Sequence, residues 1–389
     1  MKRGGDPQHI LAVTGGRADW GLLLPVLRAL EEAPDITLTL AVTGQHMAED
    51  GQGSLQAVRA EAFTQVAEID MGLGDDDSPP ALSAATGRAL GGIGQVIEAV
   101  RPDLMLVLGD RYEILAACLA ATLARVPIAH LCGGDITAGA MDDAIRHAIT
   151  KLAALHFPST EAAGRRLCQM GEDPARVHVV GSPGLDLVAA VPRLDRATLW
   201  GELGLAPADQ AFLVTLHSET LGQGTAALTG ALTQALDAYP EAAVIVTGSN
   251  ADPGGRAIDI ALRAWVDTRA NAVFRVTLGA RRYFSALGVV DAVVGNSSSG
   301  LYEAPSFAVP TVNIGTRQDG RARAASVIDC AATPEAVTEA LAQALVMDPR
   351  GVKNPYGDGR AAPRILEVLR AAPDRTRLLR KVFCEEKNP

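Results

Sequence analysis

The chain has 389 residues, and at roughly 100–200 residues per domain this length predicts two domains. Hydrophobic residues make up 48% of the chain and charged residues 21%, a composition that excludes an intrinsically disordered protein. The formal net charge of −10 argues against a nucleic-acid-binding protein and against a membrane-surface protein, because both need a basic face.

Short apolar runs alternate with helical stretches through the first half of the chain. Strands are predicted at residues 10–14, 37–42, 104–108 and 128–131. Helices are predicted at residues 21–33, 55–60, 82–100, 112–124 and 142–154. Strands that alternate with helices favour βαβ units and a parallel sheet.

The same alternation restarts in the second half. Strands are predicted at residues 212–216, 243–247, 273–276, 292–294 and 311–314. The Pro-containing stretch 181–211 is the best domain boundary, and residues 363–383 read as one or two amphipathic helices broken at Pro373. We therefore expect an α/β fold with two Rossmann-like parallel-sheet domains that face a cleft. The domains are residues 1–182 and 183–365, and a helical tail, 366–389, packs back on the first.

Cysteine usage and apolar run length limit the cellular context. The five cysteines form no Cys-x-x-Cys pair, so neither a disulfide framework nor a zinc knuckle is implied. No apolar run approaches the roughly 20 residues of a membrane span, and the first residues have no signal-peptide pattern. We expect a soluble cytoplasmic protein with no membrane partner.

Polar motifs follow the predicted strands, where ligands of such sheets bind. Their common feature is glycine beside charged or hydroxyl-bearing residues, and they occupy residues 15–21, 109–113, 132–147, 215–217, 295–303 and 315–318. Together these motifs closely resemble the hydrolysing branch of the UDP-N-acetylglucosamine 2-epimerases, from about residue 9 to about residue 330. The resemblance implies the two-domain GT-B fold. It also implies the conversion of a UDP-linked N-acetylated sugar and water into UDP and the free 2-epimer, which feeds the synthesis of sialic-acid-like and legionaminic-acid-like sugars.

A diphosphate site is expected where the Ser-rich turn 295–300 meets arginines from other loops. Backbone N–H groups at the start of a helix attract anions, and arginine binds phosphate oxygens in a bidentate manner. By resemblance the phosphates are contacted by Arg17, Ser297, Ser298 and Arg317. Glu303 would accept hydrogen bonds from the ribose hydroxyls, and Asn250 matches a position near the nucleotide. The turn taken alone is also compatible with a helix cap, and Glu303 with a surface carboxylate.

Inversion at C2 requires loss of a proton from a weakly acidic carbon. The workable route is departure of UDP with formation of a glycal, followed by addition of water, which needs acid/base groups and cations on the leaving diphosphate. By resemblance Asp110 is the first acid/base residue, Asp142 (or less surely Asp143) the second, and His217 acts on the leaving-group side. A helix cap remains the alternative for each aspartate and a structural role for the histidine.

Four further residues belong to the expected substrate site. They are His46, expected to line the sugar pocket, Arg111, Cys132 and Asp135. Cys132 stands where the related sequences carry Glu or His, and Asp135 where they usually carry Glu. A neutral thiol cannot replace a carboxylate base. Either this position is not the essential base here, or Asp135 reaches in instead, or the sugar pocket is altered for a different substrate.

The sequence thus predicts a metal-independent and cofactor-independent hydrolysing 2-epimerase. UDP-N-acetylglucosamine is the expected substrate, and UDP-2,4-diacetamido-2,4,6-trideoxyglucose is the close alternative. A GT-B glycosyltransferase is the rival enzyme class, and a nucleotide-sugar sensor would be expected to lack Asp110 or Asp142. A homodimer or higher homo-oligomer is plausible.

Overall fold

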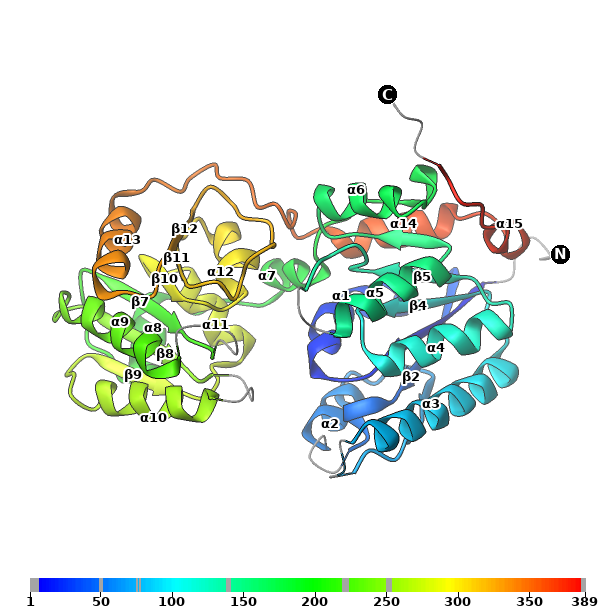
Figure 1. Ribbon diagram of the computed structural model, residues 1–389, viewed down its shortest axis with the longest axis horizontal. Helices are drawn as coiled ribbons and strands as arrows, with labels where there is room; N and C mark the ends of the chain where they lie inside the picture. The colour runs from blue at the N-terminus through cyan, green and yellow to red at the C-terminus, as the bar shows by residue number, and fades with distance from the viewer. Residues whose placement is uncertain are drawn as a thin grey trace. The chain divides into compact units, whose positions relative to one another are not determined.

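The computed structural model describes residues 7–48, 52–74, 76, 78–137, 141–218, 224–249 and 254–385. The chain forms two compact units (Figure 1). Unit 1 is Met1–Leu187 together with Tyr356–Pro389, and unit 2 is Val188–Pro355. The sequence placed these divisions at 182/183 and 365/366. The second division falls earlier in the structure, because the residues before the last long helix already contact unit 1.

Unit 1 contains a parallel sheet whose strands follow the order β3-β2-β1-β4-β5-β6. Its strands are β1 (Gln8–Thr14), β2 (Ile36–Val42), β3 (Val66–Glu68), β4 (Leu104–Leu108), β5 (Ile128–Leu131) and β6 (Leu155–Phe157). The central strands are apolar throughout because both faces of the sheet are covered.

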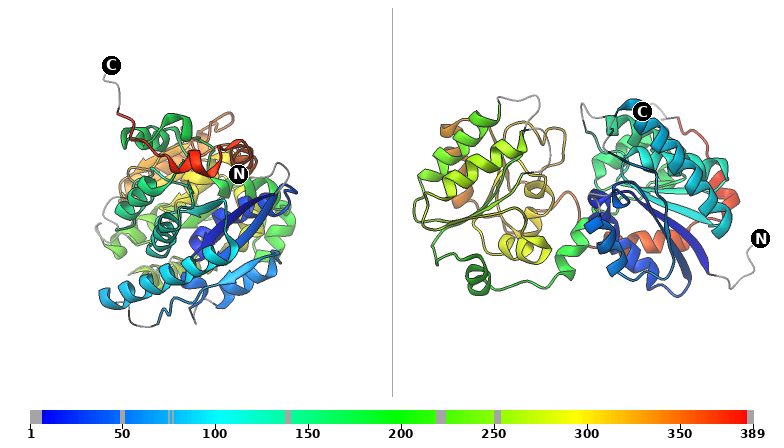
Figure 2. Two further views of the ribbon diagram at one scale, coloured as in Figure 1. Left: turned by 90° about the vertical axis from the view of Figure 1, so that its right-hand side faces the viewer. Right: turned by 90° about the horizontal axis from the view of Figure 1, so that it is seen from below.

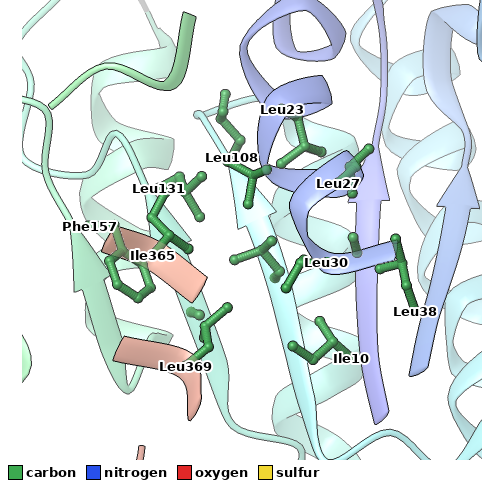
Figure 3. Close-up of a cluster of buried hydrophobic side chains, with 14 of the residues drawn as sticks. Ile10, Leu23, Leu27, Leu30, Leu38, Leu108, Leu131, Phe157, Ile365 and Leu369 are labelled. Carbon is green, nitrogen blue, oxygen red and sulfur yellow. The ribbon is translucent and has the colours of Figure 1, made fainter. Parts of the chain in front are cut away.

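Helices cover the two faces of this sheet. The helices of unit 1 are α1 (Arg17–Glu31), α2 (Gln52–Ala60), α3 (Pro79–Val100), α4 (Tyr112–Leu123), α5 (Met141–Leu152), α6 (Glu161–Gln169), α14 (Ala361–Ala371) and α15 (Arg375–Leu379). Ile10 of β1 packs with α1 and α14 on one face, whereas its neighbour Leu11 packs with α3, α4 and α5 on the other. Figure 3 shows the first of these layers, in which leucines of α1 and α14 meet the strands.

Unit 2 repeats this plan with the strand order β12-β11-β10-β7-β8-β9. Its strands are β7 (Ala211–Thr215), β8 (Ala243–Thr247), β9 (Ala272–Arg275), β10 (Ala292–Gly295), β11 (Thr311–Ile314) and β12 (Val327–Cys330). Its helices are α8 (Arg196–Leu203), α9 (Thr225–Asp237), α10 (Gly255–Val266), α11 (Gly279–Leu287), α12 (Ser299–Tyr302) and α13 (Pro334–Val346), and the short α7 (Asp186–Ala190) spans the division between the units. Figure 2 shows each sheet between layers of helices.

The strands and helices predicted from the sequence are confirmed to within a few residues, as is the α/β class with two parallel sheets. Three edge strands were missed, β3, β6 and β12. Each is short, and β3 and β12 are partly exposed, so neither shows the long apolar run that marks a central strand. In the part of the chain that the structure describes, no helix is both long and apolar enough to cross a membrane.

The tail returns to unit 1 through specific contacts. The Asp186 carboxylate accepts hydrogen bonds from the backbone N–H groups of Ala361 (2.9 Å) and Ala362 (2.7 Å), which begin α14. Ile365 and Leu369 of this helix are buried against the sheet. Pro373 separates α14 from α15, where the sequence predicted the break.

Candidate active site

The strand orders place the predicted motifs at equivalent points of the two sheets. In each sheet, successive strands are added outward on one side and then on the other. The order switches sides between β1 and β4 in unit 1 and between β7 and β10 in unit 2. Ligands of such sheets bind beyond the carboxyl ends of the strands at this switch point. The residues that follow β1, β4, β7 and β10 are therefore the ones that define a site.

The backbone of the turn after β1 is hydrogen-bonded to a nearby carboxylate, that of Asp19. Asp19 accepts hydrogen bonds from the N–H groups of Gly15 and Gly16, both at 2.8 Å, and from the Thr14 hydroxyl at 3.0 Å. These N–H groups are thus already engaged. The exposed Arg17, the first residue of α1, is the group of this turn that a phosphate can reach.

His46 does not line a pocket, contrary to the prediction. It ends the 3₁₀ turn Gly44–His46 and is fully buried. Because Thr14 donates its hydroxyl proton to Asp19, Nε2 of His46 donates to Thr14 (3.0 Å) and Nδ1 accepts from Ser54 (2.6 Å). Burial lowers the pKa of His46, so the ring stays neutral and fixes the turn after β1 from behind.

A carboxylate that the sequence analysis overlooked lies beneath the same turn. Glu113 of α4 is fully buried, and its Oε1 accepts a 2.8 Å hydrogen bond from Nε of Arg111, while Oε2 has no partner among the described residues. A Cβ added at Gly15 would lie 2.5 Å from Oε1. Burial raises the pKa of Glu113. This residue therefore orients Arg111 and requires glycine in the turn.

Arg146 of α5 organises the carboxylates after β4 and β5. Its buried guanidinium pairs with the Asp110 carboxylate and donates to the Thr137 hydroxyl (2.9 Å) and to the Asp135 carbonyl (2.9 Å). Asp143 lies 3.4 Å away. Asp110 thus serves as the partner of a buried cation. No helix-capping hydrogen bond from it is observed, since Arg111 is the N-cap residue of α4.

The two adjacent aspartates of α5 have different surroundings. Burial, and then the negative charge of Asp110, raise the pKa of Asp142, while Arg111 opposes the shift. Asp143 instead accepts a 2.7 Å hydrogen bond from the Thr137 N–H and so links Thr137 to α5. Asp142 is the member of the pair suited to proton transfer, because a raised pKa brings a carboxyl group closer to neutral pH.

Cys132 is a neutral group in this cluster. It adopts a left-handed backbone conformation (φ 60°), and its sulfur accepts a 3.4 Å hydrogen bond from the Ser159 hydroxyl. Burial, and then the charge of Asp135, raise the pKa of the thiol to about 12. The thiol therefore cannot act as a base at neutral pH.

In unit 2, the Ser-rich turn follows β10 through a position that only glycine can occupy. Gly295 has φ +136°, and a Cβ there would lie 1.9 Å from the Thr215 carbonyl oxygen of β7. Ser297 and Ser298 are partly exposed at the turn, and the helix that follows, α12, has only four residues. Such a short helix contributes little dipole, so the N–H groups and hydroxyls of the turn itself are the available donors.

His217 is fixed by its backbone. Its N–H and C=O both bond the side-chain amide of the fully buried Asn296, and its ring Nδ1 lies 3.4 Å from the Ser249 hydroxyl. His217 is partly buried at the end of β7, close to the Ser-rich turn. Asn250, the next predicted residue, lies outside the described residues.

Glu303 occupies an apolar setting behind the turn. Its Oε2 is buried without a hydrogen-bond partner among the described residues. Burial raises the pKa of Glu303 to about 7, although a hydrogen bond from Ser299 opposes the shift. The Tyr283 hydroxyl in turn donates to the Ser299 hydroxyl (2.6 Å). A carboxylate with a free acceptor atom is suited to hydroxyl groups of a ligand.

The loop after β11 adds cations to this unit. Arg317 is partly buried there. The next residue, Gln318, is fully buried and accepts a 2.9 Å hydrogen bond from Arg321. The guanidinium of Arg321 lies 5.8 Å from the centre of the Tyr302 ring, next to Glu303 in sequence. Over the residues described, no group of three or more His, Cys, Asp or Glu side chains could hold a metal ion.

Each unit therefore contributes one kind of chemistry. Unit 1 brings together two carboxylates, Asp110 and Asp142, around a buried arginine, an arrangement that can transfer protons. Unit 2 brings a histidine, hydroxyls and arginines to one sheet edge, an arrangement that can bind a phosphorylated ligand. The sequence analysis missed Arg146, Glu113, Asn296 and Gln318 as site residues. The only sequence feature that could have indicated them is that each lies within one of the polar motifs that follow the strands.

Solved structures with the same architecture identify the fold. The UDP-GlcNAc 2-epimerase of Neisseria meningitidis, bound to UDP-GlcNAc, is similar with a TM-score of 0.76 and 20% identity, covering 94% of this chain and 100% of that one. The UDP-GlcNAc 2-epimerase of Methanocaldococcus jannaschii gives a TM-score of 0.74 at 19% identity, with 94% and 100% covered. The chain thus has the two-domain α/β fold of the GT-B type.

Sequence comparison identifies the family. The sequence model of the UDP-N-acetylglucosamine 2-epimerases matches residues 28–370, and the chain belongs to this family. It is 33% identical to the hydrolysing UDP-N,N'-diacetylbacillosamine 2-epimerase of Legionella pneumophila, over 96% of this chain and 98% of that protein. It is also 33% identical to the hydrolysing GDP/UDP-N,N'-diacetylbacillosamine 2-epimerase of Campylobacter jejuni, with 83% and 84% covered. The family that the motifs indicated is confirmed, and with it a hydrolysing 2-epimerase of nucleotide-linked sugars.

Proposed function

We propose that the chain releases UDP from a UDP-linked 2-acetamido sugar and returns the sugar as its free 2-epimer, with Asp110 and Asp142 as its acid/base pair. The observation that carries this assignment is the cluster in which Arg146 holds Asp110 while Asp142 has a raised pKa. Two carboxyl groups with different surroundings are what a reaction with one proton removed and one delivered requires.

The reaction proceeds by elimination and then hydration. The Asp142 carboxylate takes the C2 proton, a double bond forms between C1 and C2, and the C1–O bond breaks with its electron pair remaining on the β-phosphate oxygen of UDP. Asp110, held by Arg146, then takes a proton from a water whose oxygen bonds to C1. Asp110 passes this proton to C2 on the opposite face, which gives the inverted free sugar, and Asp142 releases its own proton to solvent.

The departing diphosphate is stabilised by groups that follow strands of both sheets. We place Ser297, Ser298 and Arg317 of unit 2 and Arg17 of unit 1 on its oxygens, with His217 beside the leaving oxygen. Arginine and hydroxyl donors stabilise negative charge that develops as a bond to phosphate breaks. Glu303, with its unpartnered oxygen, accepts hydrogen bonds from the ribose hydroxyls.

The preferred substrate is proposed to be UDP-N,N'-diacetylbacillosamine, which is the UDP-2,4-diacetamido-2,4,6-trideoxyglucose of the sequence analysis. The names of two relatives that are 33% identical support this order of preference, which reverses the order expected from the sequence. A neutral Cys132 in place of a charged residue is compatible with a sugar that has an acetamido group at C4 and a methyl group at C6. Its product would serve the synthesis of legionaminic-acid-like sugars.

UDP-N-acetylglucosamine is the second candidate. A UDP-N-acetylglucosamine 2-epimerase of Neisseria meningitidis is 30% identical to this chain, with 87% of each covered. The decisive assay is UDP release from both UDP sugars and from GDP-linked N,N'-diacetylbacillosamine, with the sugar product identified by NMR. Release of UDP with an uninverted sugar would contradict the proposed function, and it would favour the rival GT-B glycosyltransferase with residual hydrolysis.

We also propose that the protein is a cytoplasmic homo-oligomer. Apolar side chains on the outer face of α4 support self-association, since Leu123 is 77% exposed and Leu119 38% exposed. Light scattering coupled to gel filtration measures the assembly directly, and a monomer at micromolar concentration would contradict it.

A further inference from the structure

Two buried amide side chains link the loops that carry the unit 2 site. Asn296 follows β10 and Gln318 follows β11, and neither has any exposed surface. A buried amide is stable only when its donors and acceptors are paired, so its partners determine where it can sit. Here most of these partners are backbone groups of neighbouring loops.

Asn296 extends the pairing of β7 and β10 beyond the ends of the strands. The last paired residues of the two strands are Thr215 and Gly295. Past them, Oδ1 of Asn296 accepts from the His217 N–H (2.7 Å) and Nδ2 donates to the His217 carbonyl (2.9 Å). One side chain therefore binds both backbone groups of the residue that we place beside the leaving group.

Gln318 joins the third loop to the same point. Its Nε2 donates to the carbonyl of Asn296 (2.7 Å), and its Oε1 accepts from Nη1 of Arg321 (2.9 Å). The links run in series from His217 through Asn296 and Gln318 to Arg321. Ser297 and Arg317 are direct sequence neighbours of the two amide residues, so their backbone positions are set by these links.

We propose that Asn296 and Gln318 are positioning residues for the diphosphate. Their amides hold the loops after β7, β10 and β11 in one arrangement before the nucleotide binds. Preorganised donors bind an anion without first being ordered, so loss of this arrangement weakens binding even in a folded protein. The inference rests on the diphosphate position given under the proposed function.

The substitutions Asn296→Leu and Gln318→Met test this proposal. Both keep approximate size and remove the hydrogen bonds without adding a charge, which by itself would repel UDP. We expect each to weaken UDP binding, measured by calorimetry, by about ten-fold or more, the effect of losing one or two such bonds. Hydrogen exchange at the His217 amide should become faster in Asn296→Leu, because that N–H loses its acceptor.

Asn271 provides a matched control at the opposite edge of the same sheet. It directly precedes the first residue of β9 and binds Ala206 in the same two-point manner, accepting from the N–H (2.8 Å) and donating to the carbonyl (3.2 Å). Asn271→Leu therefore removes equivalent bonds far from the loops in question. We expect it to lower thermal stability but to leave UDP affinity unchanged.

Unchanged UDP affinity in folded Asn296→Leu and Gln318→Met would overturn the proposal, as would an equal loss of affinity in Asn271→Leu. If Asn296→Leu does not fold, Gln318→Met decides alone, because it leaves the bonds between Asn296 and His217 in place. Neither binding nor exchange depends on turnover. A wild-type protein that binds UDP but acts on no UDP sugar would therefore contradict the proposed function and leave this test intact.

Discussion

Asp110 and Asp142 have different electrostatic surroundings. Arg146 holds the Asp110 carboxylate, whereas burial and the charge of Asp110 raise the pKa of Asp142. In such pairs the group with the raised pKa is the one that exchanges protons near neutral pH. On this basis we propose that Asp142 removes the C2 proton and that Asp110 activates the water.

Substitution of either aspartate by asparagine is expected to lower turnover by about 10²–10⁴-fold, the typical contribution of one acid/base group. UDP affinity should not change, because neither carboxylate is among the groups proposed to contact the nucleotide. Asp143→Asn is the matched control at the neighbouring position, since an amide oxygen can still accept from the Thr137 N–H. Steady-state kinetics of the three variants make the comparison, and near-normal turnover in Asp142→Asn would remove that residue from the mechanism.

Glu303 predicts a pH dependence of nucleotide binding. With a pKa of about 7, it becomes ionised as the pH rises through neutrality, and a carboxylate accepts hydrogen bonds more strongly than a carboxylic acid. UDP affinity of the wild type should therefore increase between pH 6 and pH 8 relative to that of Glu303→Gln. The titration of UDP itself is common to both proteins, so parallel affinity profiles from calorimetry would contradict this role.

The same residue should reduce stability at high pH. Its pKa is higher in the folded chain than the ordinary value of 4.5, so between pH 4.5 and about 7 the unfolded chain binds fewer protons and stability falls as pH rises. Glu303→Gln removes this unfavourable ionisation. Its melting temperature should exceed that of the wild type at pH 8 and approach it at pH 4.5. The opposite order at pH 8 would show that the carboxylate is not destabilised by burial.

At the scale of secondary structure, the close approach of β7 and β10 depends on one glycine. Gly295→Ala places a methyl group 1.9 Å from the Thr215 carbonyl oxygen, at a φ that side chains rarely adopt. We expect it to destabilise unit 2 by at least about 2–3 kcal/mol in denaturant unfolding. Gly230→Ala, inside α9 with open space around the added group, should instead stabilise by about 0.5–1 kcal/mol. Similar effects of the two changes would mean that the strands are not so tightly apposed.

The central strands could be predicted from sequence because both faces are buried and their residues are continuously apolar. Leu104–Leu108 and Ala243–Thr247 were found with their observed ends. The short edge strands could not, since half-exposed residues such as those of β3 show no such run. Helix α1 begins at Arg17, before the predicted start, because the Asp19 carboxylate accepts from the N–H of the N-cap residue Gly16 and stabilises the first turn there.

The site could be predicted only as far as its motifs identify side chains that face a ligand. His46 was misassigned because a histidine in a glycine-rich turn looks the same whether its ring is exposed or buried. Arg146 and Asn296 were missed because they act on groups distant in the chain, the Asp110 carboxylate and the His217 backbone. Such partners are set by tertiary structure and leave no local pattern.

The two units contain sheets of equivalent strand order, each with its own set of candidate site residues. The chain leaves unit 1 after Leu187, forms unit 2, and returns to unit 1 at Tyr356. The proposed proton-transfer groups follow β4 and β5 of one sheet, and the proposed phosphate-binding groups follow β7, β10 and β11 of the other. We propose that these two sets of groups together remove the C2 proton of the sugar while UDP departs.

Turnover in deuterated water tests that claim most directly, with the free sugar analysed by NMR and mass spectrometry. The account predicts one deuteron at C2 of the product, already present in sugar collected early, together with inverted configuration at C2. In heavy-oxygen water the label should enter C1 of the sugar and be absent from UDP, because the C1–O bond breaks. A product that retains its original hydrogen and configuration at C2 would contradict the account, since simple hydrolysis of the sugar–phosphate bond leaves C2 untouched.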